Sequence, residues 1–518
     1  MHIFLAFNGG MTMYQIGQCI VYRNVGVCRV EAIGKLGFTS DKDKEYYTLQ
    51  PHNANGNAKI YVPVDKDTFM RNVITKDEVY EYLNELQFLF SYFIMVKKQL
   101  RRGILMRAQL HFTPLKGWMN DPNGMVYING EYHLFYQHYP DDIVWGPMHW
   151  GHAVSTDLLH WEHKEIALYP DELGYIFSGS CVLDVDNVSG FGSRENPPLI
   201  AIYTSHDPGS ERQQQSIAYS LDYEHFTKYE GNPVIPNTKE KDFRDPKVFA
   251  DAQRQGYAMA LAAGKQILFY HTLDFKSWEL TGSFEPGKDN NGVAGICECP
   301  DCFQVETAQG RKWILSISMV VLKESGEEDH VMQYYVGEFD GRTFQAEQKA
   351  HILDYGTDNY AAVTFQNAKD AILLGWADSW DYVYKVPAQD YRGTMTLARK
   401  LTLQQIENQY YLCQKPVGIE AFPVVDIPKP DGIWRMHICY DRAYQLSWQT
   451  QDGAGIELLI NDTSVITKRT HPQETEAALV CSAPRLIAGE AQMDIVADGN
   501  LIEIYAENGL VSMTVKLW

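Results

Sequence analysis

Apolar residues recur along most of the chain in short runs that are separated by turn-forming residues. The runs at 216–219 and 266–270 are typical of buried strands, whereas 456–460 alternates apolar and polar residues as half-buried strands do. The dipeptide Asn508-Gly509 is a strong signal for a hairpin turn. The pattern therefore predicts a protein that is predominantly all-β.

The first part of the chain differs, because its short strand-like runs are followed by a helical pattern. We predict strands at 20–22, 25–30, 46–49 and 59–64. Thr75 and Glu78 have the spacing of a capping box, which predicts a helix that continues through Leu86. Residues 1–90 are thus expected to form a small β-barrel with a short helix, followed by a linker at 91–106.

A weak internal repeat follows, in which an aspartate precedes a large aromatic residue by four positions. The spacing of the repeat, roughly 50 to 65 residues, fits one four-stranded propeller blade with its loops. A divergent segment at 371–376 adds a fifth unit, so residues 107–415 are predicted to form a five-bladed β-propeller. Residues 420–518 are predicted to form an antiparallel β-sandwich. The four instances are Asp157 with Trp161, Asp222 with Phe226, Asp274 with Trp278, and Asp340 with Phe344.

Composition and charge narrow the class of protein. The 518-residue chain is too long for one ordinary core, and its formal charge of -21 argues against direct nucleic-acid binding, because phosphate repels a net anion. The 9 cysteines are odd in number and scattered, which favours a reducing compartment, and the cluster of Cys297, Cys299 and Cys302 lacks a fourth metal ligand. The first residues lack the features of a signal peptide, and the apolar run at 88–96 is about half as long as a membrane helix needs. We therefore expect a cytoplasmic protein with no metal and no membrane attachment.

Three carboxylates stand in unusual local settings. Asp121 lies in the turn-forming, aromatic-flanked segment 118–124, Asp245 directly precedes Pro246, and Glu298 is followed by Cys299 and a proline. Such rigid segments hold a carboxylate at a fixed angle, as a nucleophile requires. Three segments of this kind in one chain indicate carbohydrate chemistry, for which no cofactor is expected.

Short motifs around these carboxylates occur in a characteristic order. They are His111-Phe112-Thr113-Pro114, Trp118-Met119-Asn120-Asp121-Pro122-Asn123-Gly124, Phe135-Tyr136-Gln137, Trp145-Gly146-Pro147, Trp150-Gly151-His152-Ala153, Phe177-Ser178-Gly179-Ser180, Arg244-Asp245-Pro246, Glu298-Cys299-Pro300-Asp301 and Tyr391-Arg392-Gly393. Through them residues 107–518 resemble glycoside hydrolase family 32, the invertases, levanases and inulinases. The resemblance implies a five-bladed propeller with a C-terminal sandwich and a retaining β-fructofuranosidase mechanism.

The resemblance also implies roles for individual residues. Asp121 would be the nucleophile at C2 of fructose, Glu298 the general acid and then the general base, and Asp245 the group that holds fructose hydroxyls and stabilises the transition state. A pocket crowded with carboxylates is expected to raise at least one of their pKa values, and Arg244 to keep Asp245 ionised. Trp376 is added to the implied fructose pocket. Trp145, Phe177 and Trp376 fit the core of a blade as well as a sugar pocket. The implied sugar-binding residues are Asn120, Gln137, Trp145, Phe177, Ser178, Arg244, Asp245 and Trp376.

The substrate stays open at this point. The terminal non-reducing fructosyl residue of sucrose, sucrose 6-phosphate or a short fructo-oligosaccharide fits the resemblance. An exo-levanase or inulinase and a fructosyltransferase share the same catalytic residues, and an inactive fructan-binding module is a further alternative. Departures from the family pattern at His138, Cys297, Asn359 and Tyr391 lie around the expected rim and bear on leaving-group preference. A phosphorylated substrate would need a basic patch at this rim, which the sequence alone does not reveal.

The N-terminal residues carry a second resemblance, at 14–22, 25–27, 45–49 and 60–65. There residues 13–86 look like the CarD-like module shared with transcription-repair coupling factor. That resemblance implies a Tudor-like barrel that binds the RNA polymerase β subunit, so an RNA polymerase-binding protein is the alternative of another class. Two alternatives stay open. The module is a structural appendage, or the chain is a joined reading frame in which Met95 or Met106 is a separate translation start.

Overall fold

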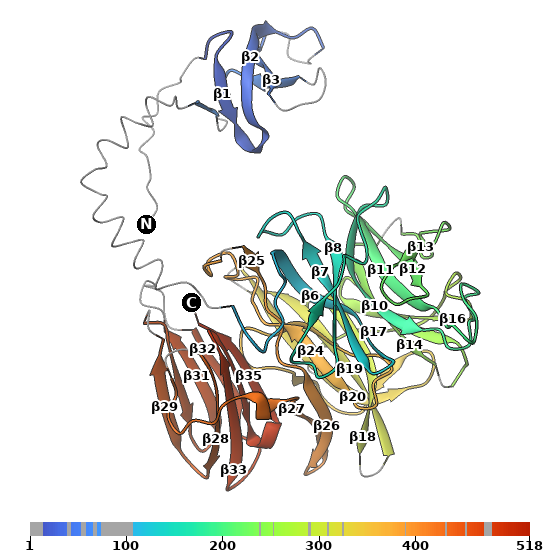
Figure 1. Cartoon of the computed structure of the whole chain (residues 1–518), viewed down its shortest axis with the longest axis vertical. Coiled ribbons are helices and arrows are strands. Elements are labelled where there is room, and N and C mark those ends of the chain that lie inside the picture. The colour runs from blue at the N-terminus through green and yellow to red at the C-terminus, as the bar shows by residue number, and fades with distance from the viewer. Residues whose placement is uncertain are drawn as a thin grey trace. The chain divides into compact units, whose positions relative to one another are not determined.

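The computed structural model describes most of the chain from residue 14 to residue 517 (Figure 1). Residues 39–42, 53–58, 66–69, 74–106, 238–239, 252, 289–291, 308–309, 324–325, 389, 430–431, 451–452 and 471–478 are not described. The chain divides into two units, Met1–Arg101 and Arg102–Trp518. The predicted helix at 75–86 and the linker at 91–106 lie outside the described residues, and the predicted domain limits stay predictions.

The N-terminal unit contains one antiparallel sheet with the strand order β4-β3-β2-β1-β5. Its strands are β1 (Cys19–Tyr22), β2 (Gly26–Lys35), β3 (Glu45–Pro51), β4 (Ile60–Pro63) and β5 (Met70–Asn72), with a single 3-10 turn, η1 (Arg23–Val25), between β1 and β2. Ile20, Cys28, Val30 and Leu49 are completely buried and form the centre of its small core. Among the described residues, no helix is long and apolar enough to cross a membrane.

The second unit begins with five antiparallel blades, of which the first four are built from consecutive strands and the fifth skips β25. Blade 1 contains β6 (Gly117–Ile128), β7 (Glu131–Tyr139), β8 (His149–Ser155) and β9 (Glu162–His163), and β25 (Tyr391–Arg392) pairs with β6 in parallel. Blade 2 contains β10 (Tyr175–Leu183), β11 (Leu199–Asp207), β12 (Arg212–Ser220) and β13 (Thr227–Lys228). Blade 3 contains β14 (Phe243–Ala250), β15 (Tyr257–Ala263), β16 (Gln266–Thr272) and β17 (Glu279–Phe284).

The last two blades complete the ring. Blade 4 contains β18 (Ile296–Thr307), β19 (Gly310–Leu322), β20 (Glu328–Phe339) and β21 (Phe344–Ala346), with β22 (His351–Ile352) also paired to β20. Blade 5 contains β23 (Tyr360–Thr364), β24 (Ile372–Trp376), β26 (Arg399–Ile406) and β27 (Gln409–Pro416). The first strands contact one another in the order β6, β10, β14, β18, β23 and back to β6. The predicted five-bladed propeller is therefore confirmed.

The sequence repeat that predicted the blades is a turn between the third and fourth strands. In blades 1 to 4 one aspartate Oδ1 accepts hydrogen bonds from the backbone N–H groups two and three residues further on. The residue after the aspartate has a left-handed backbone conformation, with φ of 67° at Leu158, 67° at Tyr223, 61° at Phe275 and 81° at Gly341. The side chain thus replaces part of the missing ladder at each turn. Blade 5 has Glu407 at its short turn and lacks this aspartate.

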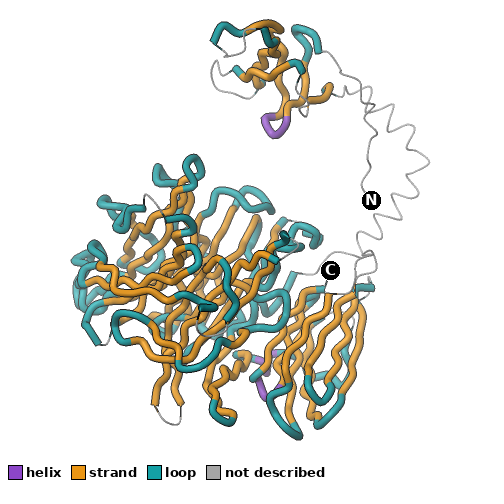
Figure 2. Tube along the Cα trace, turned by 180° about the vertical axis from the view of Figure 1, so that it is seen from behind, coloured by secondary structure: helices purple, strands orange, loops and turns teal. Residues whose placement is uncertain are grey.

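The C-terminal part is a sandwich of two four-stranded antiparallel sheets, which Figure 2 shows beside the blades. One sheet contains β28 (Ile433–Tyr440), β33 (Ala491–Asp498), β34 (Leu501–Ala506) and β35 (Val511–Lys516). The other contains β29 (Tyr444–Gln449), β30 (Gly455–Ile460), β31 (Ser464–Thr470) and β32 (Leu479–Pro484). The alternating residues Ile456, Leu458 and Ile460 face the core, and the hairpin predicted at Asn508 joins β34 to β35 through the 3-10 turn η4 (Glu507–Gly509).

Buried charges join the sandwich to the propeller. His111 contacts Asp498 through Nδ1 and Glu503 through Nε2, each at 3.0 Å, and Arg399 contacts Glu503 at 2.7 Å and Asp354 at 2.8 Å. Both ring nitrogens of His111 face carboxylates, so both act as donors and the ring is the cation. Burial alone would lower the pKa of His111, but Asp498 and Glu503 raise it to about 9. This junction therefore depends on a protonated histidine.

Candidate active site

The first strands of the five blades surround the central funnel of the propeller. Each of them is interrupted by a β-bulge at the same level of this funnel. The register breaks lie between Met119 and Pro122 in β6, Ile176 and Gly179 in β10, Arg244 and Lys247 in β14, Glu298 and Asp301 in β18, and Tyr360 and Val363 in β23. A regular strand sends successive side chains to opposite faces, whereas a bulge re-aims them. Consecutive residues such as Asn120 and Asp121 can therefore both face the funnel.

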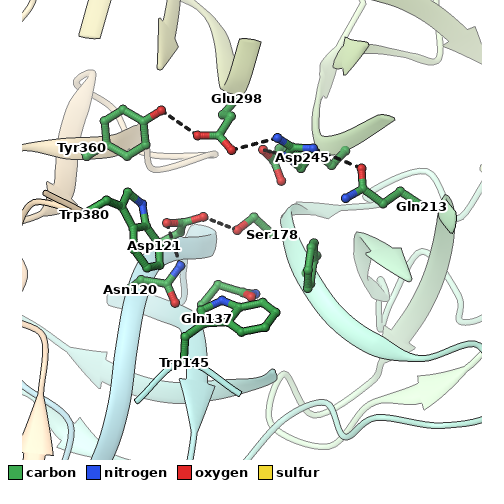
Figure 3. A pocket seen from close by; sticks show the side chains of 12 residues that line it. Asn120, Asp121, Gln137, Trp145, Ser178, Gln213, Asp245, Glu298, Tyr360 and Trp380 are labelled. Atoms are coloured by element: carbon green, nitrogen blue, oxygen red, sulfur yellow. Dashed lines mark hydrogen bonds and ion pairs between the residues drawn. The ribbon is translucent and has the colours of Figure 1, made fainter. Parts of the chain in front are cut away.

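The bulges surround a pocket of about 290 Å³ to which all five blades contribute (Figure 3). This volume is close to the lower limit of about 300 Å³ for small-molecule sites, so the pocket suits one sugar ring rather than an oligosaccharide. Figure 3 shows the side chains of Asp121, Asp245 and Glu298 directed into the same space. The lining residues are Asn120, Asp121, Gln137, Trp145, Phe177, Ser178, Gln213, Arg244, Asp245, Glu298, Tyr360 and Trp380.

Asp121 is oriented by donors on its own blade and on blade 2. Ser178 Oγ donates to Asp121 Oδ2 at 2.6 Å, and Asn120 Nδ2 donates to Asp121 Oδ1 at 2.9 Å. The amide of Asn120 is fixed in turn, because Trp118 Nε1 donates to its oxygen at 2.8 Å. Burial raises the pKa of Asp121, with the Glu298 charge adding to the rise and both donors opposing it. The two donors favour the ionised carboxylate that a nucleophile requires.

Asp245 is buried and held at a strained backbone position with φ of 63°. Its Oδ2 accepts a hydrogen bond from the backbone N–H of Cys299 at 2.9 Å, whereas Arg244 Nε lies 4.0 Å away. Burial raises the pKa of Asp245 to about 7, the charges of Glu298 and Asp121 add to the rise, and Arg244 opposes it. Arg244 therefore does not keep Asp245 ionised as fully as the sequence predicted, since its short contacts go elsewhere.

Glu298 is held by donors from two blades. Arg244 Nη2 donates to Glu298 Oε1 at 3.0 Å, and the hydroxyl of Tyr360 donates to Oε2 at 2.6 Å. Burial and the Glu298 charge raise the pKa of the Tyr360 hydroxyl well above its usual value, so it stays a donor. Only 21% of the Glu298 side chain is exposed, which leaves one side open to the funnel.

The cysteines predicted not to bind metal separate into two environments. Cys297 and Cys302 are fully buried in the core shared by blades 3 and 4. Cys299 instead faces the carboxylates, with Sγ 3.5 Å from Asp121 Oδ2 and 3.6 Å from Asp245 Oδ2. Burial raises the pKa of the Cys299 thiol well above its usual value, so the thiol is a weak donor to both carboxylates.

The aromatic wall corrects one sequence prediction. Trp145 is 38% exposed and packs edge-on against Phe177, with ring centroids 6.0 Å apart, so both line the pocket. Trp376 is fully buried and does not line it, because it ends β24 and points into the core next to Trp118. The tryptophan at the pocket is Trp380, whose ring lies 4.9 Å from that of Trp376.

Three lining residues escaped the sequence reasoning: Gln213, Tyr360 and Trp380. Gln213 accepts a hydrogen bond from Arg244 Nη1 at 3.2 Å, and no motif marks it. Tyr360 could have been found by aligning the blades, since it occupies in blade 5 the bulge position that Glu298 occupies in blade 4. The pocket otherwise unites the residues that the sequence selected.

The sandwich holds the loop that carries Trp380. Arg469 on β31 donates to the hydroxyl of Tyr382 at 3.0 Å, and Lys516 on β35 contacts Asp378 at 2.6 Å. All four of these side chains are almost fully buried. The C-terminal sheets therefore fix the rim of a pocket to which they contribute no lining residue.

A five-bladed propeller with a carboxylate-lined funnel, followed by a β-sandwich, defines a class of carbohydrate-active proteins that includes solved neighbours of this chain. An exo-inulinase from Aspergillus awamori matches with a TM-score of 0.68 and 30% identity over 80% of this chain and 93% of that one. A β-fructofuranosidase from Schwanniomyces occidentalis, complexed with fructosyl-erythritol, matches with a TM-score of 0.70 and 30% identity over 80% and 91%. The N-terminal domain of glycosyl hydrolases family 32 matches residues 111–416, and the chain belongs to this family.

Sequence comparison gives relatives of the same kind. A levanase from Bacillus subtilis (strain 168) is 47% identical over 322 residues, which cover 60% of this chain and 47% of that protein. The extracellular exo-inulinase inuE of Aspergillus niger is 38% identical over 348 residues, which cover 60% of this chain and 64% of that protein. The chain thus spans about half to two thirds of the length of these relatives. Residues 14–74 match a different family, the CarD-like/TRCF RID domain.

Proposed function

We propose that the protein is a retaining β-fructofuranosidase that removes terminal non-reducing β-D-fructofuranosyl residues. The convergence of Asp121, Asp245 and Glu298 on a pocket sized for one sugar ring carries this proposal. Retaining hydrolysis needs one carboxylate as nucleophile and a second carboxyl group as acid and base. The relatives named levanase, exo-inulinase and invertase support the fructoside as the substrate class.

In the first step, Asp121 attacks C2 of the fructosyl residue while the bond from C2 to the leaving oxygen breaks. Glu298 gives its proton to that oxygen, so the leaving sugar departs neutral and a fructosyl ester remains on Asp121. In the second step, Glu298 takes a proton from water, the water oxygen attacks C2, and Asp121 is released as a carboxylate. Asp245 accepts hydrogen bonds from fructose hydroxyls, which favour its ionised form despite the burial that raises its pKa.

Arg244 and Tyr360 are positioning residues in this scheme. Their hydrogen bonds reach different oxygens of Glu298, which fixes the plane of the carboxyl group. A fixed carboxyl group keeps its proton aligned with the leaving oxygen, and such alignment accounts for a large part of an enzymatic rate enhancement.

A substrate panel with the full chain tests the proposal. Release of fructose and glucose from sucrose, and of fructose from inulin and levan, is measured for the wild type, Asp121→Asn, Glu298→Gln and Glu457→Gln. We expect Glu298→Gln to lower kcat/KM by about 10²–10⁴-fold. Glu457→Gln, on the exposed side of β30, serves as the matched control and should retain activity. Full activity in Asp121→Asn or Glu298→Gln, or no release from any substrate, contradicts the proposal.

The same panel separates hydrolysis from transfer. Hydrolysis of sucrose releases equal amounts of glucose and fructose, whereas a fructosyltransferase releases more glucose than fructose, because part of the fructose is passed to another sugar. We propose hydrolysis, so that the ratio stays near one at substrate concentrations around KM. An excess of glucose would assign the chain to the transferase alternative.

A second function is proposed for the N-terminal unit, which is docking to RNA polymerase. The family match at 14–74 supports it, and so do apolar side chains on its surface, since Phe38 is 69% exposed and Ile16 64% exposed. The ring of Phe38 packs on that of Tyr61 at 5.1 Å, which forms a small aromatic patch. Binding of purified RNA polymerase to the full chain, and its loss in Phe38→Ser, test this function. No binding at micromolar concentrations contradicts it.

A further inference from the structure

A second cavity of about 490 Å³ adjoins the sugar pocket. It shares Arg244, Glu298 and Trp380 with that pocket, so the two cavities adjoin at the Glu298 side chain. Its remaining wall comes from blades 3 and 4. The residues that line the second cavity alone are Asp242, Ile296, Val320, Glu328 and His330.

The position of Glu298 indicates what this cavity holds. In the proposed reaction Glu298 protonates the oxygen between C2 of fructose and the leaving sugar. The leaving sugar therefore extends from the sugar pocket past Glu298. Because Glu298 lines both cavities, the leaving sugar enters the second cavity. The ring of Trp380 borders both spaces and gives each of them part of an apolar wall.

The charge of the second cavity is negative. Asp242 and Glu328 contribute carboxylates, and the Asp242 side chain is 37% exposed. The one arginine is already engaged, since Arg244 contacts Asp242 at 2.7 Å and Glu298 at 3.0 Å. Among the described residues, the lining contains no lysine and no second arginine. The lining histidine, His330, lies 3.3 Å from a further carboxylate, that of Asp381.

A phosphate group on the leaving sugar meets repulsion in such a cavity. Phosphate monoesters carry a charge of about -1.5 to -2 at neutral pH, and their recognition uses arginine or lysine donors. Like charges within about one Debye length, roughly 8 Å at physiological salt, repel across a partly exposed site. A neutral sugar meets no such repulsion, and the carboxylates can accept hydrogen bonds from its hydroxyls.

We propose that the second cavity selects unphosphorylated leaving groups, so that the enzyme cleaves sucrose and neutral fructo-oligosaccharides and discriminates against sucrose 6-phosphate. Glu328, an exposed residue at the start of β20, is the specificity-determining residue. This inference rests on the proposed fructosidase function and decides between substrates that the sequence left open.

The test compares kcat/KM for sucrose and sucrose 6-phosphate with the full chain at pH 7. We expect sucrose to be preferred by about tenfold or more at low ionic strength, and the preference to shrink when salt screens the charges. Glu328→Lys should lower the preference by at least about tenfold, and Glu328→Gln by a smaller factor. Glu327→Lys makes the same charge change at the neighbouring residue, which does not line the cavity, and should lower the preference by a smaller factor than Glu328→Lys.

Equal use of both substrates by the wild type, or a preference for sucrose 6-phosphate, overturns the inference while leaving the fructosidase function intact. An unchanged ratio in both Glu328 variants overturns the role of Glu328. Absence of fructose release from every substrate instead refutes the proposed function itself, and the inference falls with it.

Discussion

The junction between propeller and sandwich makes stability depend on pH through His111. Its folded pKa of about 9 lies above the ordinary value of 6.5, because the carboxylates of Asp498 and Glu503 oppose the effect of burial. Since the folded state binds this proton more tightly, the contribution is complete below pH 6.5 and is lost as pH rises through about 9. At about 1.36 kcal/mol for each tenfold change in proton affinity, the rise corresponds to about 3 kcal/mol.

The assay compares the wild type with His111→Gln between pH 6 and pH 10. All 11 tryptophans lie at residues 118–518, so tryptophan fluorescence during denaturant unfolding reports on the second unit alone. Near pH 6 the variant removes a cation from two buried carboxylates, of which only Glu503 keeps a second one, Arg399, and the variant should be less stable by several kcal/mol. By pH 10 the wild type has lost the same proton, and we expect the gap to narrow by about 3 kcal/mol. Other groups that titrate in this range are common to both proteins and cancel.

A matched control is available on the surface. His437 contacts Asp494 at 2.8 Å, but half of its side chain is exposed, so His437→Gln should change stability by less than about 1 kcal/mol. A gap between wild type and His111→Gln that stays constant from pH 6 to pH 10 would refute the assignment of a protonated His111. At acid pH the dependence of stability on pH has the opposite sign. Arg399 and His111 outweigh the effect of burial and lower the pKa of Glu503 to about 2. The contribution of Glu503 to stability is therefore present above pH 4.5 and is lost as pH falls towards 2.

Further expectations concern a buried ion pair between neighbouring blades and two residues of the site. Lys247→Met should cost about 3–5 kcal/mol in urea unfolding, because buried Asp301 loses its cation at 3.2 Å, and a loss below about 1 kcal/mol would contradict this. Tyr360→Phe removes the 2.6 Å hydrogen bond to Glu298 and should lower kcat/KM about 10–100-fold with little loss of stability, which an unchanged rate would contradict. Trp380→Ala should raise KM more than it lowers kcat, since the ring borders both cavities, and steady-state kinetics with the reverse pattern would exclude that role.

The blade number was predictable because turns leave a local signal in sequence. An aspartate that caps two backbone N–H groups must stand at a fixed distance from the next strand, so Asp157 and Asp222 recur with the same spacing. Blade 5 lacks this signal and was found only through the apolar run that becomes β24. Blade 5 was thus predicted from the apolar pattern of a strand, because its turn carries no aspartate signal.

The site was partly predictable for a similar reason. Asp121 and Asp245 stand before prolines, which cannot complete a strand ladder and therefore coincide with the bulges. Tyr360 has no such neighbour and looks like an ordinary strand residue. Trp376 and Trp380 are equally aromatic, and only their positions relative to the end of β24 decide which one is buried. The ion pairs of the junction leave no trace in sequence, because their members lie between 45 and 392 residues apart.

One backbone device repeated five times accounts for the composition of the pocket. Eight of the 12 lining residues lie at the five bulges, where blades 1 to 3 each supply two neighbouring residues and blades 4 and 5 each supply one. The other four lining residues come from neighbouring strands and loops. A bulge re-aims the side chains beside it but does not set which residues they are, since the last paired residue before the break is Arg244 in blade 3, Glu298 in blade 4 and Tyr360 in blade 5. A carboxylate on blade 1 can then accept a hydrogen bond from blade 2 and contact a thiol from blade 4 at one level. Because each blade supplies its own bulge, a change in one lining residue alters the chemistry without moving the other four first strands.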